Sequence, residues 1–484
     1  MITQETQNQL TAYLQRQLME LTARCVNYTT DDAGAPLPRR DVYGRLAQHL
    51  DAFEAGNAAW RWLVISGLRG LGKTTLLMQL LDQIKAAPLH KIYLSVDEVT
   101  RQLGVTLGQV LAAYETLLGE SFTQNGPPVY IFLDEVQYDP DWAITIKNLY
   151  DRSRRVFVAA TGSAALQLQT NADISRRAIF ETIYPLSFRE YVRLIHRQTR
   201  PLEVTAQLRE GLLGSNTGKE AMYYFKRCIG PVRRFYATFP QEITINKYLE
   251  IGTLPSLLRL HNLGVAYDQL KKTVDTIIGK DIAQLQTFSP ATLNMFARLI
   301  YLLTNNDVTA VDNVAHDLRL SPTTLQQMLD TLELSGLIYR LAPYGNVGVQ
   351  VRKASKYLFA APAFRSMYLN LLGTTLTPAD LRAKVCEDTV AMYLTKLLTR
   401  RGYSYALTYD AAKNCADFIV DIHEKQQALV LEVGSGTKGS EQVAASIARH
   451  NLKYSLGITV SQSPLQLDPG GQFVNLPLSM FLLL

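Results

Sequence analysis

The sequence predicts an α/β protein whose first domain is a parallel β-sheet covered by helices, and two observations carry this prediction. Short apolar runs alternate with amphipathic stretches from Trp60 onward, which is typical of strands and helices that alternate along the chain. A glycine-rich segment follows the first apolar run directly and precedes an amphipathic stretch. The chain has 484 residues, too many for one ordinary hydrophobic core, so we expect roughly two to four domains.

Composition narrows the class of protein without assigning a function. Hydrophobic residues make up 47% and charged residues 19% of the chain, so widespread disorder is not expected. The formal net charge of +6 and the pI near 8.9 are compatible with a polyanionic partner, but over this length they decide nothing. Met1 to Gln9 lacks the features of a secretory signal, and no apolar segment approaches about 18 residues. We therefore expect a cytoplasmic protein without a membrane segment.

Cysteine and histidine usage gives no sign of a metal site. The cysteines Cys25, Cys228, Cys386 and Cys415 are scattered, as are the seven histidines. Their spacing matches neither a zinc site nor a disulfide framework. We expect reduced cysteines and no transition metal.

The elements of the first domain can be placed in order. An apolar stripe at helical spacing predicts a helix that packs on its own domain rather than on a partner; its residues are Leu10, Leu14, Leu18 and Leu21. A polar linker from Thr29 to Pro38 follows. Four apolar runs then predict buried parallel strands, at Trp62 to Ser66, Lys91 to Val96, Val129 to Leu133 and Arg155 to Thr161.

The segment between the first strand and the next helix carries a phosphate-binding motif, G-x-x-x-x-G-K-[ST]. It reads Gly67, Leu68, Arg69, Gly70, Leu71, Gly72, Lys73, Thr74, and Thr75 begins the helix. Glycines let backbone N–H groups curl around a phosphate, and the helix N-terminus adds partial positive charge. We expect Lys73 to bridge the β- and γ-phosphates of ATP and Thr74 to hold Mg²⁺. A glycine-rich turn that happens to carry Lys-Thr is the alternative, which the strand and helix on either side disfavour.

Two acidic residues supply the other half of the expected site. The apolar run from Val129 to Leu133 ends in Asp134 and Glu135. At the carboxyl end of a buried strand, Asp134 can bind the Mg²⁺ shell while Glu135 polarises the water that attacks the γ-phosphate. A solvated acidic turn is the alternative, and the phosphate-binding motif about 60 residues upstream disfavours it.

Polar residues after the next strand extend this site. Thr161 and Ser163 are candidate sensors of the γ-phosphate. Arg176 and Arg177 can supply a cationic finger to the γ-phosphate of a neighbouring subunit or of their own site. A surface pair of arginines is the alternative, so the sequence leaves their role open.

A mainly helical stretch from Pro185 to about Ile300 precedes a predicted helix-turn-helix. Residues Asp312 to Leu318 form one short expected helix, and Ser321 and Pro322 supply the N-cap and first residue of the second. The second helix has an apolar face made of Leu325, Met328, Leu329 and Leu332. These two helices predict a helix-turn-helix.

Strand-like residues beyond that helix predict a winged helix. Leu337 to Leu341 and Val349 to Val351 are the expected strands, joined by a turn at Tyr344 to Asn346. The wing is basic, with Arg352, Lys353 and Lys356. The outward residues of the second helix that can touch the edges of a DNA groove are Thr323, Thr324, Gln326 and Gln327. Winged helices also serve as packing modules, so DNA contact and packing stay open as alternatives.

Several motifs together resemble those of one family. They are Gly67 to Thr74, Leu133 to Gln137, Ala160 to Ser163, Pro185 to Tyr191, and Tyr248 to Pro255. With them the chain resembles AAA+-like archaeal and bacterial ATPases related to the STAND and MoxR-like NTPases, which carry a C-terminal restriction-endonuclease-like domain. This resemblance implies an ATPase core, a helical lid, a winged helix and a nuclease-like fold, but no single biological role. Thr253 stands where such proteins usually have a second glycine, a departure that concerns only the lid turn.

The C-terminal segment resembles a restriction-endonuclease-like core. Strands are expected at Tyr403 to Tyr409, Asp417 to Asp421 and Ala428 to Val433. Asp417 and Glu432 would hold Mg²⁺, with Glu387 on a preceding helix as a third acid. In the resembled family a lysine follows the glutamate by two positions; here Gly434 stands in that place, and Lys438 is the candidate substitute. An inactive fold kept for assembly or binding is therefore favoured over cleavage.

Together these predictions give a P-loop NTPase parallel sheet with a helical lid, then a winged helix, then an α/β restriction-endonuclease-like domain. The expected bounds are 1–38 for the N-terminal helix and linker, 39–195 for the ATPase core, 196–300 for the lid, 301–378 for the winged helix and 379–484 for the nuclease-like domain. The expected function is ATP hydrolysis with Mg²⁺, driving a switch or motor on nucleic acid in defence or DNA processing. The alternative is an ATP-regulated scaffold that binds a protein partner; a homo-oligomer is compatible with both.

Overall fold

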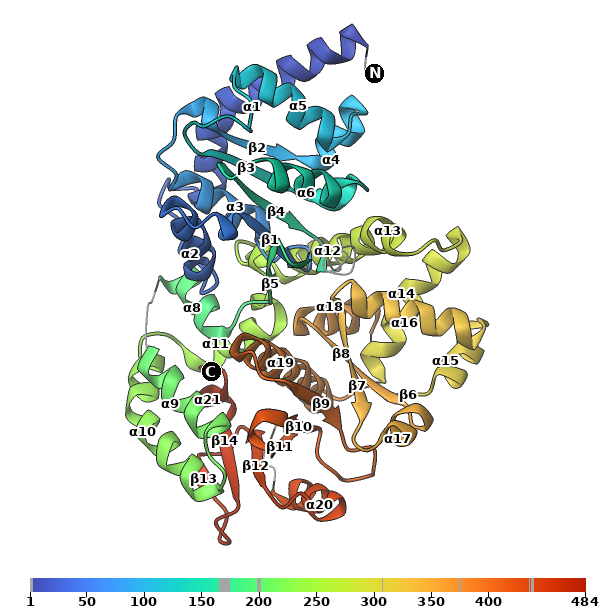
Figure 1. The fold of residues 1–484 in the computed structure, drawn as a ribbon. Helices are drawn as coiled ribbons and strands as arrows, with labels where there is room; N and C mark the ends of the chain where they lie inside the picture. The colour runs from blue at the N-terminus through green and yellow to red at the C-terminus, as the bar shows by residue number, and fades with distance from the viewer. Residues whose placement is uncertain are drawn as a thin grey trace. The chain divides into compact units, whose positions relative to one another are not determined.

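The protein divides into two compact units, Met1–Ile183 and Tyr184–Leu484 (Figure 1). The structure is a computed structural model that describes residues 3–164, 175–197, 202–306, 308–373, 376–434, 436 and 439–484. Within these ranges, no helix is both long enough and apolar enough to span a membrane.

The first unit is built on a five-stranded sheet in which every neighbouring pair is parallel, in the order β2-β3-β4-β1-β5. Its strands are β1 (Trp62–Gly67), β2 (Lys91–Ser95), β3 (Val129–Asp134), β4 (Val156–Gly162) and β5 (Ile179–Ile183). The four predicted strands are confirmed, while β5 was not predicted. Every residue of β1, β3 and β4 is buried, which explains their unbroken apolar sequences.

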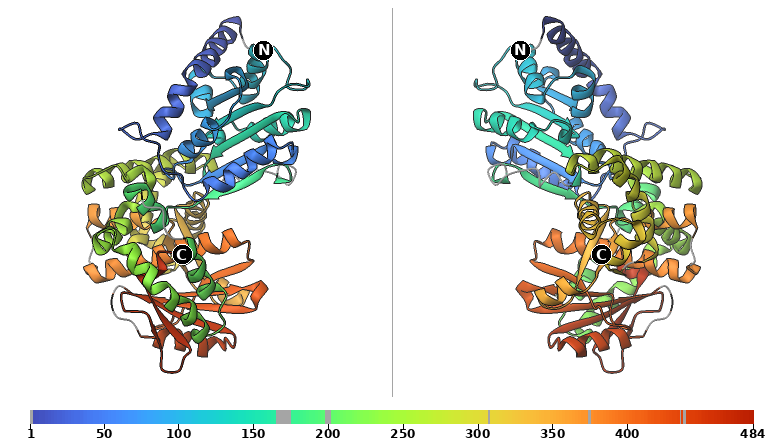
Figure 2. Two further views of the ribbon diagram at one scale, coloured as in Figure 1. Left: turned by 90° about the vertical axis from the view of Figure 1, so that its left-hand side faces the viewer. Right: turned by 90° about the vertical axis from the view of Figure 1, so that its right-hand side faces the viewer.

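Helices pack on both faces of this sheet (Figure 2). The principal ones are α1 (Gln4–Thr29), α2 (Tyr43–Glu54), α3 (Lys73–Asp82), α5 (Leu107–Leu118) and α6 (Trp142–Arg152), with a short α4 (Val96–Glu98). Val156 and Val158 of β4 share a core with α5 and α6, whereas Phe157 between them contacts Phe53 of α2, with ring centroids 5.4 Å apart. Side chains alternate between the faces of a strand, so both faces are covered.

The N-terminal helix α1 belongs to this unit. Its residues Leu10, Tyr13 and Leu14 are buried in the same core as strands β1 to β4. The prediction that its apolar stripe packs on its own domain is confirmed.

The second unit begins with the predicted helical stretch, which is confirmed. Its helices are α8 (Phe188–His196), α9 (Leu202–Leu213), α10 (Gly218–Tyr236), α11 (Gln241–Lys247), α12 (Leu263–Thr276), α13 (Ala283–Leu285) and α14 (Pro290–Asn305). Helices α9 and α10 share one core with the C-terminal residues. Tyr236 donates a hydrogen bond to the Ser479 carbonyl at 2.8 Å, and Thr205 donates to the Leu483 carbonyl at 2.7 Å. These two helices are therefore fixed to the end of the chain.

The predicted helix-turn-helix lies in the middle of this unit. It comprises α15 (Val311–Leu318) and α16 (Pro322–Leu334), and Ser321 caps α16 by accepting a hydrogen bond from the Thr324 N–H at 3.0 Å. The strands beside it are β6 (Val308–Thr309), β7 (Ile338–Pro343) and β8 (Ser355–Phe359), followed by α18 (Pro362–Leu372). The predicted cap and apolar face of α16 are confirmed.

The predicted strand at Val349 to Val351 is wrong. These residues lie in helix α17 (Val347–Arg352), whose N-cap Asn346 accepts a hydrogen bond from the Val349 N–H at 3.1 Å. An asparagine side chain at this position satisfies a free N–H of the first helical turn, so the local cap outweighs the strand preference of the valines.

Strands β6, β7 and β8 and the six strands that follow them form one nine-stranded sheet, ordered β13-β14-β12-β11-β10-β9-β7-β8-β6. The added strands are β9 (Tyr405–Tyr409), β10 (Phe418–Ile422), β11 (Gln427–Val433), β12 (Ser455–Ser461), β13 (Gln466–Leu467) and β14 (Phe473–Pro477), and the added helices are α19 (Pro378–Arg401), α20 (Glu441–His450) and α21 (Leu478–Phe481). The three predicted C-terminal strands are confirmed. Strand β7 pairs with β9 through Ala342↔Thr408 and Pro343↔Tyr409, so the strands after the helix-turn-helix continue into the C-terminal sheet.

A buried ion pair holds the centre of this unit together. Arg365 of α18 donates to both carboxylate oxygens of Asp388 on α19, at 2.6 and 2.9 Å, and to the Thr304 carbonyl at 2.6 Å. Both charged side chains are fully buried. Such a pair is stable only when its hydrogen bonds are satisfied, and here the guanidinium joins α14, α18 and α19.

Candidate nucleotide site

The phosphate-binding motif lies at the carboxyl end of β1, which pairs with β4 and β5 in the first sheet. Gly70 and Gly72 adopt positive φ angles of 85° and 81°, a conformation that favours glycine. A Cβ at Gly67 would lie 2.7 Å from the Ile183 carbonyl oxygen, so this position also excludes a side chain. The chain then enters α3 at Lys73, which points free backbone N–H groups into the loop.

The Lys73 side chain folds back inside this loop. Its ammonium donates to the Gly67 carbonyl at 3.0 Å and to the Leu68 carbonyl at 3.4 Å. It also lies 4.0 Å from a Glu135 carboxylate oxygen. Lys73 is only 6% exposed, so a buried positive charge sits in the curl of the glycine loop.

The second half of the site surrounds Asp134, the last residue of β3. The Thr74 hydroxyl donates to Asp134 Oδ2 at 2.7 Å, and the Thr161 hydroxyl donates to Oδ1. Burial raises the pKa of Asp134, and the neighbouring Glu135 carboxylate raises it further, although the hydroxyl donors oppose both effects. The structure thus brings Thr74, Asp134 and Thr161 together as the sequence predicted.

Glu135 is held beside this cluster in a left-handed backbone conformation, with φ of 55°. Its N–H donates to the Thr161 hydroxyl at 3.1 Å, and Gln137 donates to its carboxylate at 2.5 Å. Such a conformation is uncommon for a residue other than glycine and is seen at functional sites. The backbone therefore aims the Glu135 carboxylate away from the strand and toward Lys73.

The other predicted residues of this site lie nearby without joining the hydrogen-bonded cluster. Arg69 contacts the Tyr138 hydroxyl at 3.5 Å, and Thr75 is half-buried in the first turn of α3. Ser163 follows β4 directly, and within the ranges that the structure describes no hydrogen bond links it to the cluster. Thr161 is therefore the better-placed of the two predicted sensors.

Arg176 and Arg177 lie at the amino ends of the strands, opposite to the end that carries the phosphate-binding loop. They precede β5, whose Ile179 pairs with Leu63 near the start of β1, whereas the phosphate-binding loop follows the end of β1. Arg177 donates to Asp151 at 2.8 Å, and Arg176 is exposed. A strand of five residues spans about 17 Å, so the structure does not bring either arginine to the loop of its own chain. Their role toward a neighbouring subunit stays a prediction.

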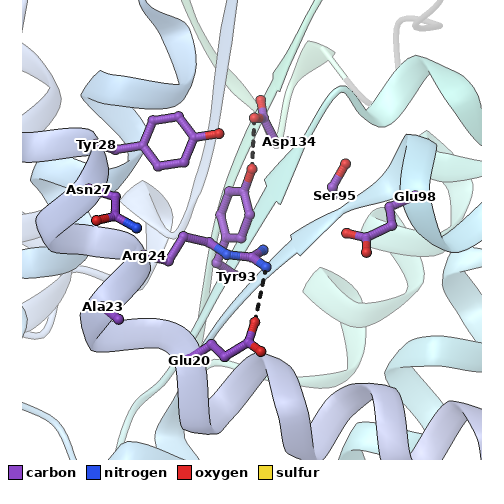
Figure 3. A pocket seen from close by; sticks show the side chains of 9 residues that line it. All are labelled: Glu20, Ala23, Arg24, Asn27, Tyr28, Tyr93, Ser95, Glu98 and Asp134. Atoms are coloured by element: carbon purple, nitrogen blue, oxygen red, sulfur yellow. Dashed lines mark hydrogen bonds and ion pairs between the residues drawn. The ribbon is translucent and has the colours of Figure 1, made fainter.

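Two residues that the sequence did not single out complete the site. The Tyr93 hydroxyl donates to Asp134 Oδ2 at 2.9 Å from the neighbouring strand β2 (Figure 3), and Arg40 donates to the Leu71 carbonyl at 2.9 Å behind the glycine loop. Neither belongs to a motif. The only hint of this role in the sequence was the hydroxyl of Tyr93 inside an otherwise apolar strand. The contact itself depends on the pairing of β2 with β3, which local sequence does not reveal.

A cavity of about 580 Å³ opens on the Tyr93 side of Asp134 (Figure 3). Helix α1 forms one wall, and Arg24 lies over the Tyr93 ring, 5.4 Å from its centroid. The lining residues are Glu20, Ala23, Arg24, Asn27, Tyr28, Tyr93, Ser95, Glu98 and Asp134. Asp134 is thus reached both from the glycine loop and from this cavity.

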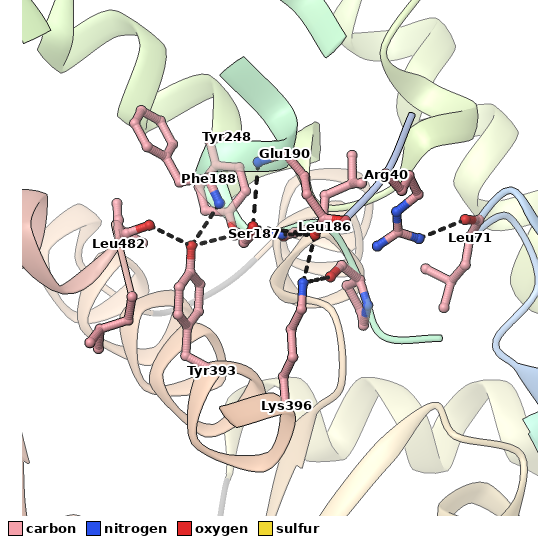
Figure 4. A network of polar contacts seen from close by, with 12 residues as sticks. Arg40, Leu71, Leu186, Ser187, Phe188, Glu190, Tyr248, Tyr393, Lys396 and Leu482 are labelled. Atoms are coloured by element: carbon pink, nitrogen blue, oxygen red, sulfur yellow. Dashed lines mark hydrogen bonds and ion pairs between the residues drawn. The ribbon is translucent and has the colours of Figure 1, made fainter. Parts of the chain in front are cut away.

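The motif from Pro185 to Tyr191 has a structural role in the second unit. Ser187 caps α8, and Glu190 bonds back to the Ser187 N–H at 3.0 Å, while Lys396 of α19 lies 2.6 Å from the Glu190 carboxylate (Figure 4). Tyr393 accepts from the Phe188 N–H at 2.7 Å. This buried network joins α8 to α19, which explains a motif whose residues are mainly polar or aromatic.

A second predicted cluster lies in the C-terminal sheet and includes an unexpected lysine. Lys356 of β8 lies 2.6 Å from Glu387 Oε2 and 3.2 Å from Asp417 Oδ1. Asp417 also accepts the Val433 N–H at 2.9 Å, and Glu432 is buried on β11. The prediction that Lys356 contacts DNA is wrong, because this side chain is only 5% exposed and is paired with two acids.

This cluster differs from a metal site in its geometry. Among the described residues, no three His, Cys, Asp or Glu side chains are grouped so that they could hold a metal ion. Lys438, the candidate substitute for the lysine missing at Gly434, lies outside the described residues. The ammonium that the structure places among the acids comes from β8 instead.

The remaining predicted DNA contacts are partly exposed. Thr323 and Gln327 of α16 are exposed, whereas the Thr324 hydroxyl pairs with that of Ser321 at 2.8 Å. Arg352 and Lys353 are exposed at the end of α17. These four accessible residues are thus the ones that stay candidates.

Two families of protein domains match separate parts of the chain. Residues 59–192 match the family described as "AAA domain", which covers the glycine loop, Asp134, Glu135 and Thr161. Residues 243–375 match a domain of unknown function. The first match shows that the chain carries an AAA-type P-loop ATPase domain.

One relative is similar to this chain over most of its length. The uncharacterized protein MJ1637 of Methanocaldococcus jannaschii is 33% identical over 450 residues, covering 92% of this chain and 89% of that protein. Solved structures include the Thermotoga maritima Holliday junction branch migration motor RuvB, with 16% identity, TM-score 0.27 and coverage of 63% and 90%, and AMPPCP-bound DnaA from Aquifex aeolicus, with 14% identity, TM-score 0.27 and coverage of 61% and 89%. At scores this low the two superpositions support no statement about this chain.

Proposed function

We propose that this chain, which belongs to the family of the Methanocaldococcus jannaschii protein MJ1637, hydrolyses ATP in its first unit and uses the cycle to act on a nucleic acid. The AAA domain match supports the first part of the proposal. The second part rests on the helix-turn-helix and on exposed basic residues.

The residues of the site fit a magnesium-bound nucleoside triphosphate. The glycine loop offers backbone N–H groups, and Lys73 offers a cation buried within it. Thr74 and Asp134 offer the hydroxyl and carboxylate oxygens that Mg²⁺ prefers. When bound, Mg²⁺ would neutralise charge on the β- and γ-phosphates. The observation that carries the proposal is the 2.7 Å hydrogen bond between Thr74 and Asp134, which joins the two halves of the site.

The chain's own residues then have distinct roles. Glu135 would accept a proton from the attacking water, since its carboxylate points toward the loop beside Lys73. Thr161 bonds to Asp134 and to the Glu135 backbone, so it would hold the metal ligand and the base in register. Arg40 supports the loop from behind.

Nucleotide binding can be tested with one substitution and a matched control. Lys73→Ala is expected to abolish ATP binding and turnover, because it removes the ammonium that lies inside the loop at the Gly67 and Leu68 carbonyls. Lys85→Ala removes an exposed lysine of the same unit and is expected to behave like the unaltered protein. Equal ATP affinity of the Lys73→Ala protein, measured by calorimetry on folded material, would overturn the proposal.

Action on nucleic acid is supported by the order α14, β6, α15, α16, β7 and β8, which is compatible with a winged helix. A scaffold that binds a protein partner is the second candidate. The pairing of Lys356 with Glu387 favours it, because a lysine fixed among the acids suits an inactive tail. DNA-stimulated ATP turnover is expected for the first function and not for the second.

Assembly into a homo-oligomer is part of the same proposal. Arg176 is exposed and could serve the loop of a neighbouring copy. Arg176→Ala is expected to lower ATP turnover only under conditions in which light scattering detects an oligomer; a loss of turnover in the monomer would contradict this role.

A further inference from the structure

Helix α10 presents a basic surface that the proposed site and the winged helix do not use. One side of the helix is buried in the core of the second unit, through Ala221, Met222, Phe225, Cys228, Val232, Phe235 and Tyr236. The other side is exposed, and we call it the basic face; it consists of Lys219, Tyr223, Lys226, Arg227, Gly230, Arg233 and Arg234. These positions are spaced by three or four residues, so they lie on one side of the helix.

The charges on the basic face are of one sign. Five of its seven residues are cations, which extend over about 22 Å from Lys219 to Arg234. In the part of the chain that is described, no carboxylate pairs with any of these cations. The one acid that α10 exposes, Glu220, lies in the first turn and accepts a hydrogen bond from the Asn216 N–H at 2.8 Å, just before the N-cap Thr217. The face therefore carries a concentrated positive potential that its own unit does not neutralise.

An aromatic ring lies among these cations. Tyr223 is 59% exposed, and Arg227 holds it by donating to its hydroxyl at 2.9 Å. The Arg227 guanidinium also lies over the ring, 5.4 Å from its centroid. Gly230, one helical turn beyond Arg227, carries no side chain. A fixed, exposed ring between cations is the arrangement on which nucleic-acid bases stack.

We infer that the basic face binds the phosphodiester backbone of a nucleic acid without reading its sequence, and that Tyr223 stacks on an unpaired base. The inference rests on the nucleic-acid part of the proposed function but not on ATP hydrolysis. It names a surface other than the winged helix. The five cations would contact phosphates, and the stacking contact favours a single strand over a duplex.

An anionic membrane is a poorer match for this surface. A helix that lies on a membrane inserts its apolar face, but the apolar face of α10 is buried in its own core. Ile229, 41% exposed, is the one aliphatic side chain of the helix that is strongly exposed. The ligand expected here is therefore a flexible polyanion that contacts the cations and the ring from outside.

The test measures the anisotropy of a fluorescent oligothymidine of about 20 nucleotides, long enough to cover this surface. The variant Lys226→Gln with Arg227→Gln and Arg234→Gln removes three cations and retains Arg233 in the last turn of the helix. We expect affinity to fall at least tenfold at low salt, and the slope of log affinity against log salt to decrease by about 2. The double variant Lys271→Gln with Lys272→Gln, on exposed residues of α12, is the matched control and should bind normally.

Further variants distinguish a single strand from a duplex as the ligand, and the basic face from the winged helix as the binding surface. Tyr223→Ala should weaken oligothymidine binding roughly fivefold or more and duplex binding much less, while Tyr223→Phe should retain the affinity. Arg352→Gln with Lys353→Gln tests the winged helix in the same assay. Unchanged oligothymidine binding by the triple variant would overturn the inference, as would equally strong binding of the unaltered protein to phosphatidylserine vesicles.

The outcome is distinguishable from failure of the proposed function. The Lys73→Ala protein should bind oligothymidine normally, since the basic face does not contain the nucleotide site. If the unaltered protein binds no nucleic acid, the inference and the nucleic-acid part of the proposed function both fail, while ATP turnover stands. If it binds and the triple variant binds equally well, only the basic face is excluded.

Discussion

The Lys356 ammonium lies 2.6 Å from the Glu387 carboxylate, joining strand β8 to helix α19 inside the second unit. The lysine is 5% exposed and also contacts Asp417 at 3.2 Å. Strand β8 follows the helix-turn-helix, whereas both acids belong to the C-terminal segment. A buried charge of this kind requires a partner, so the placement of Lys356 on β8 depends on the acids of the C-terminal segment.

Replacing Lys356 with methionine is expected to destabilise the second unit by about 3 kcal/mol, because a buried ammonium is lost and two partly buried carboxylates lose their cation. The measurement is the denaturant midpoint of the full chain, followed by circular dichroism. Lys353→Met, at an exposed position three residues earlier, should change it little. Adding Glu387→Gln to Lys356→Met should recover part of the loss; an unchanged midpoint in the single variant would show that the pair contributes nothing.

Cleavage of DNA by the acid cluster is not expected. The lysine that serves the acids in the resembled nucleases is absent at Gly434, and Lys356 is held in an ion pair with Glu387. Plasmid incubated with the protein and Mg²⁺ or Mn²⁺ should therefore remain supercoiled. Nicking that disappears in the Glu432→Ala variant would contradict this prediction and assign the site as a nuclease.

Substituting Glu135 with glutamine should separate ATP binding from hydrolysis. The amide keeps the size and the hydrogen bond from Gln137 but cannot accept a proton. We expect turnover to fall by about 10²–10⁴-fold, the usual contribution of a general base, with ATP affinity almost unchanged. Single-turnover kinetics and calorimetry measure the two quantities. Equal losses of affinity and turnover would instead indicate a disrupted loop.

Removing the Tyr93 hydroxyl should shift the acid limb of the ATPase pH profile to higher pH. Burial and Glu135 already raise the pKa of Asp134, and the Tyr93 hydrogen bond is one of the interactions that lower it. In Tyr93→Phe the carboxyl stays protonated to a higher pH, so Mg²⁺-dependent turnover should be lost sooner as pH falls. Tyr114→Phe, which removes a hydroxyl bonded to the Leu89 carbonyl in the same unit, should leave the profile unchanged.

Acid should weaken the first unit through Glu181. Burial alone would raise the pKa of Glu181, but hydrogen bonds from His49 and Arg45 outweigh it and lower the pKa to about 2. A depressed carboxyl pKa stabilises the fold above the ordinary value of 4.5, and this stabilisation is lost as pH falls from there to about 2. The difference in unfolding free energy between the unaltered protein and Glu181→Gln should be on the order of 2 kcal/mol at neutral pH and shrink below pH 4.5. A constant difference across that range would contradict the assignment.

Local patterns in the sequence determined much of the first unit. Strands β1, β3 and β4 are buried apolar runs and β2 is buried at its centre, and the glycines of the loop stand where positive φ angles occur. The caps at Ser187 and Ser321 also follow from local chemistry. These features depend on residues within a few positions of one another, so periodicity and motif spacing are sufficient to predict them.

Only the tertiary structure decided which distant side chains meet. Tyr93 reaches Asp134 because β2 pairs with β3, and Lys356 reaches Glu387 because β8 lies against α19. From the sequence we expected Lys356 to belong to a basic wing and Val349 to belong to a strand. In the structure Lys356 is buried, and Val349 lies in the helix that Asn346 caps. Strand order and packing depend on the total free energy of the folded unit rather than on any local stretch, so the sequence predicted the elements while the fold selected their partners.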